Sequence, residues 1–391
     1  MRFAKITDRV ANLAANKWAV HVEGKQRRDA GEKLIFLSIG EPDLPPAPAI
    51  LDVAAKQMKA GRTRYSGGNG EGPLLNALSQ YYTAQTGRAI APNQFLFVPG
   101  TQTALAIAFM SIIEAGDEVI LLDPYYATYE AVISAPGGIP VAVKLDADRG
   151  FHPDIASIEH AITPRTRAIL LNSPSNPTGA VFSEAEIRAI SALAVRYDLW
   201  IVSDEVYATL IHGDVKFYSP FFEKELEERV IVCSSISKSH ALPGFRAGWI
   251  AGSAAYCEKV TPVSETLLFG SPQFLQDATA YALTHVFAET RQMQQLYVAR
   301  AKALLEGLRG NNKVTARMPE GGMFVMVDVR KTGLSGEDFA LRLLREKDVV
   351  TMPGESFGAS AAGHLRVALS VDEAEIAEAA KRIAALAAEI I

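Results

Sequence analysis

The segment from Ser234 to Arg246 brings serines, a lysine and an arginine together directly after an apolar run. Val230–Cys233 is rich in β-branched residues, which predicts a strand buried on both faces. Lys238, just past the end of this strand, is held by the backbone, and desolvation beside another cation would make it a nucleophilic amine. The serine hydroxyls and the forked cation of Arg246 suit a phosphate. This combination predicts a site for pyridoxal phosphate; the alternative is that Lys238 is an ordinary solvated lysine.

Predicted strands alternate with helices from Phe95 onward, which indicates an α/β fold with a mainly parallel sheet covered by helices. We expect strands at 95–98, 119–122, 141–143, 168–171, 200–202 and 230–233. We expect helices at 101–114, 126–134, 154–162 and, after a capping box at Ser183 and Glu186, to about 197. Ligands of such sheets bind beyond the carboxyl ends of the strands.

A polar cluster follows five of these strands, each at the carboxyl end. The clusters are 99–102, 123–126, 172–179, 203–207 and the lysine segment. The first one opens a helix, whose free N–H groups favour an anion. Any single cluster is compatible with ordinary turn chemistry. Five clusters at one edge of a sheet predict a common site.

The remaining chain predicts an N-terminal arm and a smaller C-terminal α/β domain. Residues 1–33 suggest a helix and arm, 34–39 a short strand before a turn at 40–43, and 47–60 a helix. The glycine-rich loop 62–73 around Tyr65 is either flexible or shaped for a ligand. We assign 1–45 to the arm and part of the small domain, 46–285 to a large cofactor-binding domain and 286–391 to the small domain.

Within the C-terminal region we expect a long helix from about 272 to 308, a strand at 322–328, a helix at 335–346 and a strand at 364–369. Ser370 and Glu373 form a second capping box that starts a terminal helix, with Ile376, Ile383, Leu386 and Ile390 on one face. Arg366 stands within a strand that is otherwise apolar. Either it snorkels to solvent or it has a structural or binding role.

Composition and charge favour a cytoplasmic globular protein. The 391 residues are 49% hydrophobic and 21% charged, with a net charge of −5, which gives no reason to expect nucleic acid or an anionic membrane as a partner. We expect Cys233 and Cys257 to be packed thiols rather than a disulfide. Met1–Asp8 is not typical of a signal peptide, and no window approaches the ~20 apolar residues of a membrane span. We predict no metal site.

The ordered motifs resemble those of the class I pyridoxal-phosphate aminotransferases, which have the aspartate aminotransferase fold (fold type I). The resemblance covers essentially the whole chain. It is carried by Asn176-Pro177-Thr178-Gly179, Asp204-Glu205-Val206-Tyr207, Ser235-Ile236-Ser237-Lys238 with Arg246, and Arg366. The resemblance implies that Lys238 forms a Schiff base with the cofactor and, when displaced, carries a proton as general base and acid.

The resemblance also implies roles for the other motif residues. Asp204 would pair with the pyridine nitrogen, Asn176 and Tyr207 would donate to the phenolic oxygen, and Tyr126 would stack on the ring, where the family often has tryptophan. The phosphate would be held by Gly100, Thr101, Gln102, Ser235 and Arg246, and Ser237 would also bind the cofactor. The substrate would be bound by Arg366, Gly40, Asn176 and Trp18. Tyr65 would reach the phosphate of a neighbouring subunit, so a homodimer is the implied partner.

The amino donor is a separate question. Dicarboxylate-specific relatives need a second cation, yet residues 89–143 contain no lysine, arginine or histidine, and 260–290 contain only His285. Arg62, Arg64 or His21 could substitute. Segments 237–241, 270–274 and 321–328 are similar to arginine–pyruvate transaminases, so we expect a basic or neutral donor with pyruvate. Alternatives are an aspartate/2-oxoglutarate-type aminotransferase, a C–S β-lyase of the same fold and, least favoured, a non-catalytic regulator module.

Overall fold

The computed structural model describes residues 1–14 and 17–390, and in this part of the chain the main sheet has seven strands in the order β2-β8-β7-β6-β5-β3-β4. The strands are β2 Phe95–Val98, β3 Glu118–Asp123, β4 Ile139–Lys144, β5 Thr166–Asn172, β6 Trp200–Asp204, β7 Val230–Ser235 and β8 Gly248–Ala251. Strands β7, β6, β5, β3 and β4 pair in parallel. The mainly parallel sheet is confirmed. Strand β8, which lies antiparallel between β2 and β7, was not predicted.

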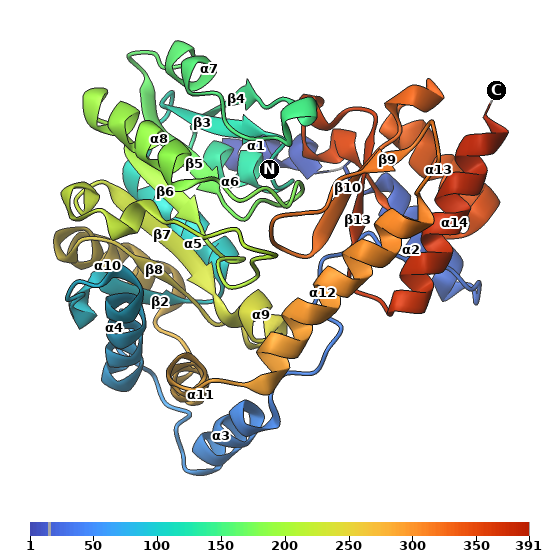
Figure 1. Ribbon diagram of the computed structural model, residues 1–391. Helices are drawn as coiled ribbons and strands as arrows, with labels where there is room; N and C mark the ends of the chain where they lie inside the picture. The colour runs from blue at the N-terminus through green and yellow to red at the C-terminus, as the bar shows by residue number, and fades with distance from the viewer. Residues whose placement is uncertain (15–16, 391) are drawn as a thin grey trace.

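Helices cover both faces of the main sheet (Figure 1). Leu96, Val119 and Ile231 lie in one hydrophobic cluster with α5 (Thr101–Ile112), α6 (Tyr129–Ser134) and α10 (Ala254–Leu268). The strand residues next to them point the other way. They pack with α3 (Pro48–Lys59), α4 (Gly72–Thr86), α7 (Ile155–His160), α8 (Glu184–Arg196) and α11 (Gln273–Thr284). This alternation follows from the two-residue period of a strand that is apolar on both sides.

A second, antiparallel sheet, the C-terminal sheet, has the order β12-β13-β10-β9. Its strands are β9 Thr315–Ala316, β10 Phe324–Asp328, β12 Met352–Pro353 and β13 His364–Ala368. The neighbouring helices are α2 (Ala19–Asp29), α12 (Ala288–Gly307), α13 (Gly336–Lys347) and α14 (Glu373–Glu389). β1 (Ile35–Phe36) pairs in parallel with β11 (Val349–Val350), so N-terminal residues join the C-terminal core. α12 runs from the α11 side of the molecule to α14 (Figure 1).

Two predictions about helices in the C-terminal region were wrong. The expected helix 272–308 is two helices, α11 and α12, because the backbone is extended at His285 and Phe287. The cap of α14 is Asp372, whose carboxylate accepts the Glu375 N–H at 2.8 Å. Ser370 instead donates its hydroxyl to the Ile39 carbonyl at 2.9 Å. The capping box at the start of α8 and the buried face of α14 are confirmed.

The expectation about the cysteines is confirmed. Cys233 and Cys257 are buried free thiols. No helix in the described ranges is both long and apolar enough to cross a membrane. The N-terminal arm begins with α1 (Lys5–Ala14), which packs beside α6.

Candidate active site

A cavity of about 320 Å³ lies at the carboxyl ends of the main-sheet strands, where β10 and β13 of the C-terminal sheet face them. It is lined by predicted residues from all five polar clusters, and the cluster after β3 contributes Tyr126. The predicted residues in its lining are Trp18, Gly40, Thr101, Gln102, Tyr126, Asn176, Asp204, Tyr207, Ser235, Ser237, Lys238, Arg246 and Arg366. The tertiary structure therefore brings these residues together.

Lys238 lies in α9 (Ile236–Ser239), a single turn that follows β7 directly. Its Nζ donates to the Gly40 carbonyl at 2.6 Å. Burial lowers the pKa of this amine to about 8, with Arg366 and Arg246 lowering it further and Glu41 opposing them. An amine with this pKa can both accept and return a proton near neutral pH.

Asp204 ends β6 and is buried. Its Oδ2 accepts the Tyr129 hydroxyl at 2.7 Å, and its Oδ1 accepts the Val206 N–H at 3.2 Å. Burial raises the pKa of the carboxyl to about 6, against the effect of these two hydrogen bonds. Within the described ranges no cation forms an ion pair with Asp204. A buried carboxylate that lines a cavity without a counter-ion fits the protonated pyridine nitrogen of pyridoxal phosphate.

The opposite end of the cavity is built to hold an anion. Thr101 begins α5 and donates its hydroxyl to the Ser235 Oγ at 3.0 Å. Arg246 has a left-handed backbone, with φ of +49°, and its guanidinium donates to the carbonyls of Pro243 at 2.9 Å and Pro99 at 3.2 Å. A Cβ on Gly100 would lie 2.3 Å from Arg246 Nη2, so glycine is needed for this approach. The N-terminus of α5, the hydroxyls of Thr101 and Ser235 and the guanidinium of Arg246 together suit a phosphate.

Arg366 is 2% exposed, which rules out snorkelling to solvent. Its guanidinium lies between the rings of Phe324 and Phe357, at 4.4 and 4.5 Å from their centroids. It donates to Asn176 Oδ1 at 2.9 Å and to the Ser38 carbonyl. Burial lowers the pKa of Arg366 to about 10, so the group stays charged at neutral pH. A buried guanidinium that lines the cavity can bind one carboxylate through two parallel hydrogen bonds.

Two residues of the site were missed from the sequence. Tyr129 supplies the hydroxyl that Asp204 accepts. Asn172 donates to the Asp204 carbonyl at 3.1 Å and accepts the Asn176 N–H at 2.8 Å, which orients both residues. The sequence signal for Tyr129 is its spacing, because it stands three residues after Tyr126. In the structure the two rings meet edge-on, with centroids 5.7 Å apart. Asn172 was placed in a polar cluster but given no role.

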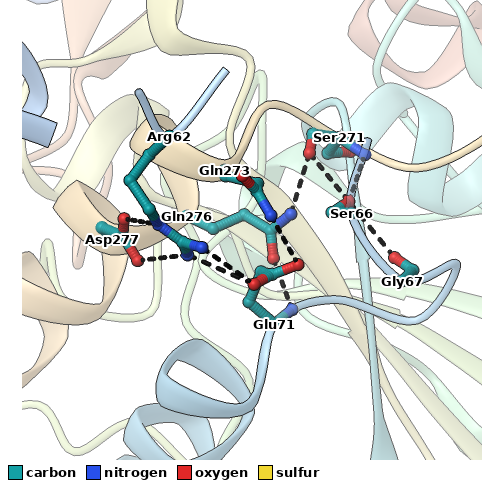
Figure 2. Close-up of polar contacts among 8 residues, drawn as sticks. All are labelled: Arg62, Ser66, Gly67, Glu71, Ser271, Gln273, Gln276 and Asp277. Atoms are coloured by element: carbon teal, nitrogen blue, oxygen red, sulfur yellow. Dashed lines mark hydrogen bonds and ion pairs between the residues drawn. The ribbon is translucent and has the colours of Figure 1, made fainter. Parts of the chain in front are cut away.

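Besides Gly100, which lies against the Arg246 guanidinium, the predicted residue that does not line this cavity is Tyr65. Its side chain is 81% exposed and meets the ring of Phe269 edge-on at 4.9 Å. Figure 2 shows how the loop that carries Tyr65 is held: loop 62–71 is hydrogen-bonded to Ser271 and to the first turns of α11. Arg62 forms a fork with Asp277 at 2.7 and 2.9 Å, and Ser66 Oγ donates to the Ser271 carbonyl at 2.9 Å. The glycine-rich loop is therefore held in shape.

Comparisons with known proteins agree with this geometry. The model of the family "Aminotransferase class I and II" matches residues 32–383. The arginine–pyruvate transaminase of Pseudomonas aeruginosa is 38% identical over 391 residues, covering 100% of this chain and 99% of the relative. The aspartate/prephenate aminotransferase of Thermus thermophilus is 31% identical, covering 94% of each.

Solved structures give the same result. The aspartate aminotransferase of Thermus thermophilus with maleate superimposes with a TM-score of 0.92 at 30% identity, covering 99% of this chain and 100% of that one. The aspartate aminotransferase of Rhizobium meliloti gives 0.93 at 26% identity, covering 100% of both. This chain therefore belongs to the class I and II aminotransferases, and it is a transaminase of the aspartate aminotransferase fold whose cofactor is pyridoxal phosphate.

Proposed function

We propose that this transaminase takes its amino group from a basic or neutral L-amino acid, with arginine as the leading donor, and passes it to a 2-oxo acid such as pyruvate. The proposal depends on the charges in the cavity. Its described lining contains three cations, Lys238, Arg246 and Arg366. Each has a role in binding or chemistry, so no lining cation remains for a second carboxylate. An acidic substrate side chain would then be buried without a counter-ion, which is costly.

The sequence offered three other residues as a second cation for an acidic substrate side chain: Arg62, Arg64 and His21. Their surroundings give an acidic donor little support. Arg62 forms ion pairs with Asp277 and Glu71. His21 is bonded to Ser38 Oγ at 2.9 Å, and burial lowers its pKa, which disfavours the cation. Arg64 is exposed on the loop that carries Tyr65. The arginine–pyruvate transaminase relative, similar over the whole chain, supports the same choice of donor.

Pyridoxal phosphate, when bound, supplies a ring that accepts the electrons released at the substrate α-carbon. We propose that Lys238, the residue that binds the cofactor covalently, takes the α-proton as general base and returns it as general acid. Asp204 would supply the negative charge for the pyridine nitrogen, and Tyr129 orients that carboxylate. Arg366, steadied by Asn176, binds the substrate carboxylate.

The other predicted site residues receive roles in the same proposal. Asn176 and Tyr207 would donate to the phenolic oxygen and Tyr126 would cover the ring. Gly40 and Trp18 would border the substrate. Gly100, Thr101, Gln102, Ser235 and Arg246 would hold the phosphate, and Ser237 would also contact the cofactor. Burial raises the pKa of Tyr207 far above its ordinary value, so its hydroxyl keeps its proton and can donate.

A screen of half-reactions tests the choice of donor. Holoenzyme is mixed with one amino acid at a time, without an oxo acid, and the loss of cofactor absorbance is followed. We expect arginine and alanine to react and aspartate and glutamate to react poorly. The Thermus relatives favour aspartate as a second candidate, and a response to aspartate and glutamate alone would establish it. Release of ammonia and pyruvate from a cysteine conjugate would indicate β-lyase activity.

We also propose a homodimer in which Tyr65 donates to the phosphate at the site of the partner. Its support is that Tyr65 and Phe269 form an exposed aromatic pair, 81% and 68% exposed, on two loops that are bonded together (Figure 2). We further propose the domain limits 1–45, 46–285 and 286–391, which two separate hydrophobic clusters support. A cytoplasmic location is proposed from the two unpaired thiols.

A further inference from the structure

Residues 37–43, which we call the crossing segment, follow β1 in the connection to α3; the segment lines the cavity at Gly40 and is hydrogen-bonded to β13 of the C-terminal sheet at Leu37. Consecutive backbone carbonyls of this segment each accept a hydrogen bond from a different group. Leu37 O accepts from Ala368 N, Ser38 O from Arg366 Nη2, Ile39 O from Ser370 Oγ and Gly40 O from Lys238 Nζ. The segment therefore contacts both the reactive amine and the buried fork.

The far end of the crossing segment is held by Arg300 of α12. Its guanidinium donates to Asp43 Oδ1 at 2.8 Å and to Oδ2 at 2.6 Å, and also to the Leu369 carbonyl at 2.8 Å. Arg300 is 4% exposed, whereas the Asp43 side chain is 26% exposed. A buried guanidinium is costly unless it is paired, and Asp43 is the carboxylate that pairs with it in the described chain.

We infer that Arg300 is a positioning residue for transamination: its fork with Asp43 fixes the crossing segment, and the segment fixes Arg366 and Lys238. Neither Arg300 nor Asp43 is in the described lining of the cavity, so neither touches substrate or cofactor directly. The inference rests on the proposed role of Arg366 in binding the substrate carboxylate.

The chemistry of the fork explains why a lysine could not replace Arg300. A planar guanidinium serves both Asp43 oxygens and the Leu369 carbonyl at fixed angles, whereas an ammonium is a single point charge on a flexible stem. A shift of the segment would remove the Ser38 carbonyl from Arg366 and leave a buried donor unsatisfied. Substrate binding should suffer, while the phosphate-binding residues, which lie on other segments, keep the cofactor.

The experiment compares Arg300→Lys and Asp43→Asn with wild-type holoenzyme, using the amino acid that wild type converts fastest. We expect each variant to raise the KM of both the amino acid and the oxo acid about tenfold or more, and to change the Kd of pyridoxal phosphate by less than about twofold. The double variant should be no worse than the worse single one, because the two residues act as one unit. The matched control is Arg345→Lys. Arg345 lies on the surface of α13, and its guanidinium donates to both carboxylate oxygens of Glu23 in a similar way.

Two outcomes would overturn the inference: a lower Tm with unchanged KM values in Asp43→Asn, or a loss of cofactor affinity equal to the loss of substrate affinity. Should Arg300→Lys fail to fold, Asp43→Asn decides alone, because its side chain is partly exposed. Arg366→Lys separates this inference from the function on which it rests. If Arg366→Lys raises KM and Asp43→Asn does not, positioning by Arg300 is wrong and carboxylate binding by Arg366 stands.

Discussion

Lys238 and Arg366 obtain their properties from neighbours that are far away in the sequence. The amine of Lys238 is bonded to Gly40, and burial lowers its pKa to about 8. The guanidinium of Arg366 is fixed by Asn176 and Ser38 between two phenylalanine rings. The Arg366 guanidinium is therefore oriented before a substrate arrives, which reduces the entropy lost on binding.

At the residue scale, Lys238→Ala should abolish transamination, because the variant lacks the base that moves the α-proton. The cofactor should still bind without a covalent bond, because the phosphate-binding residues remain. Turnover and cofactor absorbance are measured together. Borohydride treatment of the wild type should add a pyridoxyl group to the peptide that contains Lys238. Retained transamination in the variant, or the absence of this adduct, would contradict the assignment.

Arg366→Lys should raise the KM of the amino donor about 10- to 100-fold, since the lost charge-assisted hydrogen bond is worth about 1.5–3 kcal/mol. Steady-state kinetics with a fixed oxo acid measures this change. Arg382→Lys, which alters a surface ion pair with Glu378 on α14, serves as the control and should leave KM within about twofold. An unchanged KM in Arg366→Lys would mean that the carboxylate binds elsewhere.

At the scale of elements, His152 links Glu186 of α8 to Glu320, which lies in the segment before β10 of the C-terminal sheet. Its Nε2 lies 3.2 Å from Glu320 and its Nδ1 lies 3.0 Å from Glu186. These carboxylates, Glu320 first, raise the pKa of His152 to about 9. The ordinary value of an unfolded histidine is about 6.5. The stabilisation is therefore fully present below about pH 6.5 and is lost as the pH rises through about 9.

His152→Gln should therefore lower Tm relative to wild type most at pH 6 and least near pH 9.5. Thermal unfolding of both proteins across this range measures the difference. His160→Gln, which changes an exposed histidine at the end of α7, is the control and should show no such trend. A difference in Tm that is constant with pH would show that the charge of His152 does not stabilise the fold.

At the scale of the whole molecule, the cavity lies where two hydrophobic cores meet. Tyr207 follows a strand of the main sheet but packs in the core of the C-terminal sheet. Met326 of β10 packs in a core of the main sheet. A proposed third contribution comes from a second copy of the chain through Tyr65.

Tyr65→Phe should weaken pyridoxal phosphate binding about tenfold, because it removes one hydroxyl donor to a charged phosphate, and it should leave the dimer intact. Titration of the apoenzyme with cofactor and sedimentation velocity provide the two measurements. Tyr197→Phe, at an exposed tyrosine bonded to Glu159, is the control. A monomeric wild type would contradict the dimer. An unchanged Kd in a dimeric variant would contradict only the role of Tyr65.

The sequence by itself determined the family, the alternation of strands and helices and nearly the whole set of polar residues at the sheet edge. It could do so because local patterns reveal parallel strands, and the carboxyl ends of parallel strands share one edge. Strand β8 was not predicted because it has four residues and begins with a glycine, which is also typical of a turn. The break between α11 and α12 escaped because His285–Phe287 carries no glycine or proline.

Only the tertiary structure decided which residues act together. Tyr129 against Asp204, Gly40 against Lys238 and Arg300 against Asp43 are pairs separated by 75, 198 and 257 residues. Such contacts depend on how sheets and helices pack, which no local pattern records. The same packing removes water from Lys238, Asp204 and Arg366, and this desolvation sets the pKa values on which their chemistry depends.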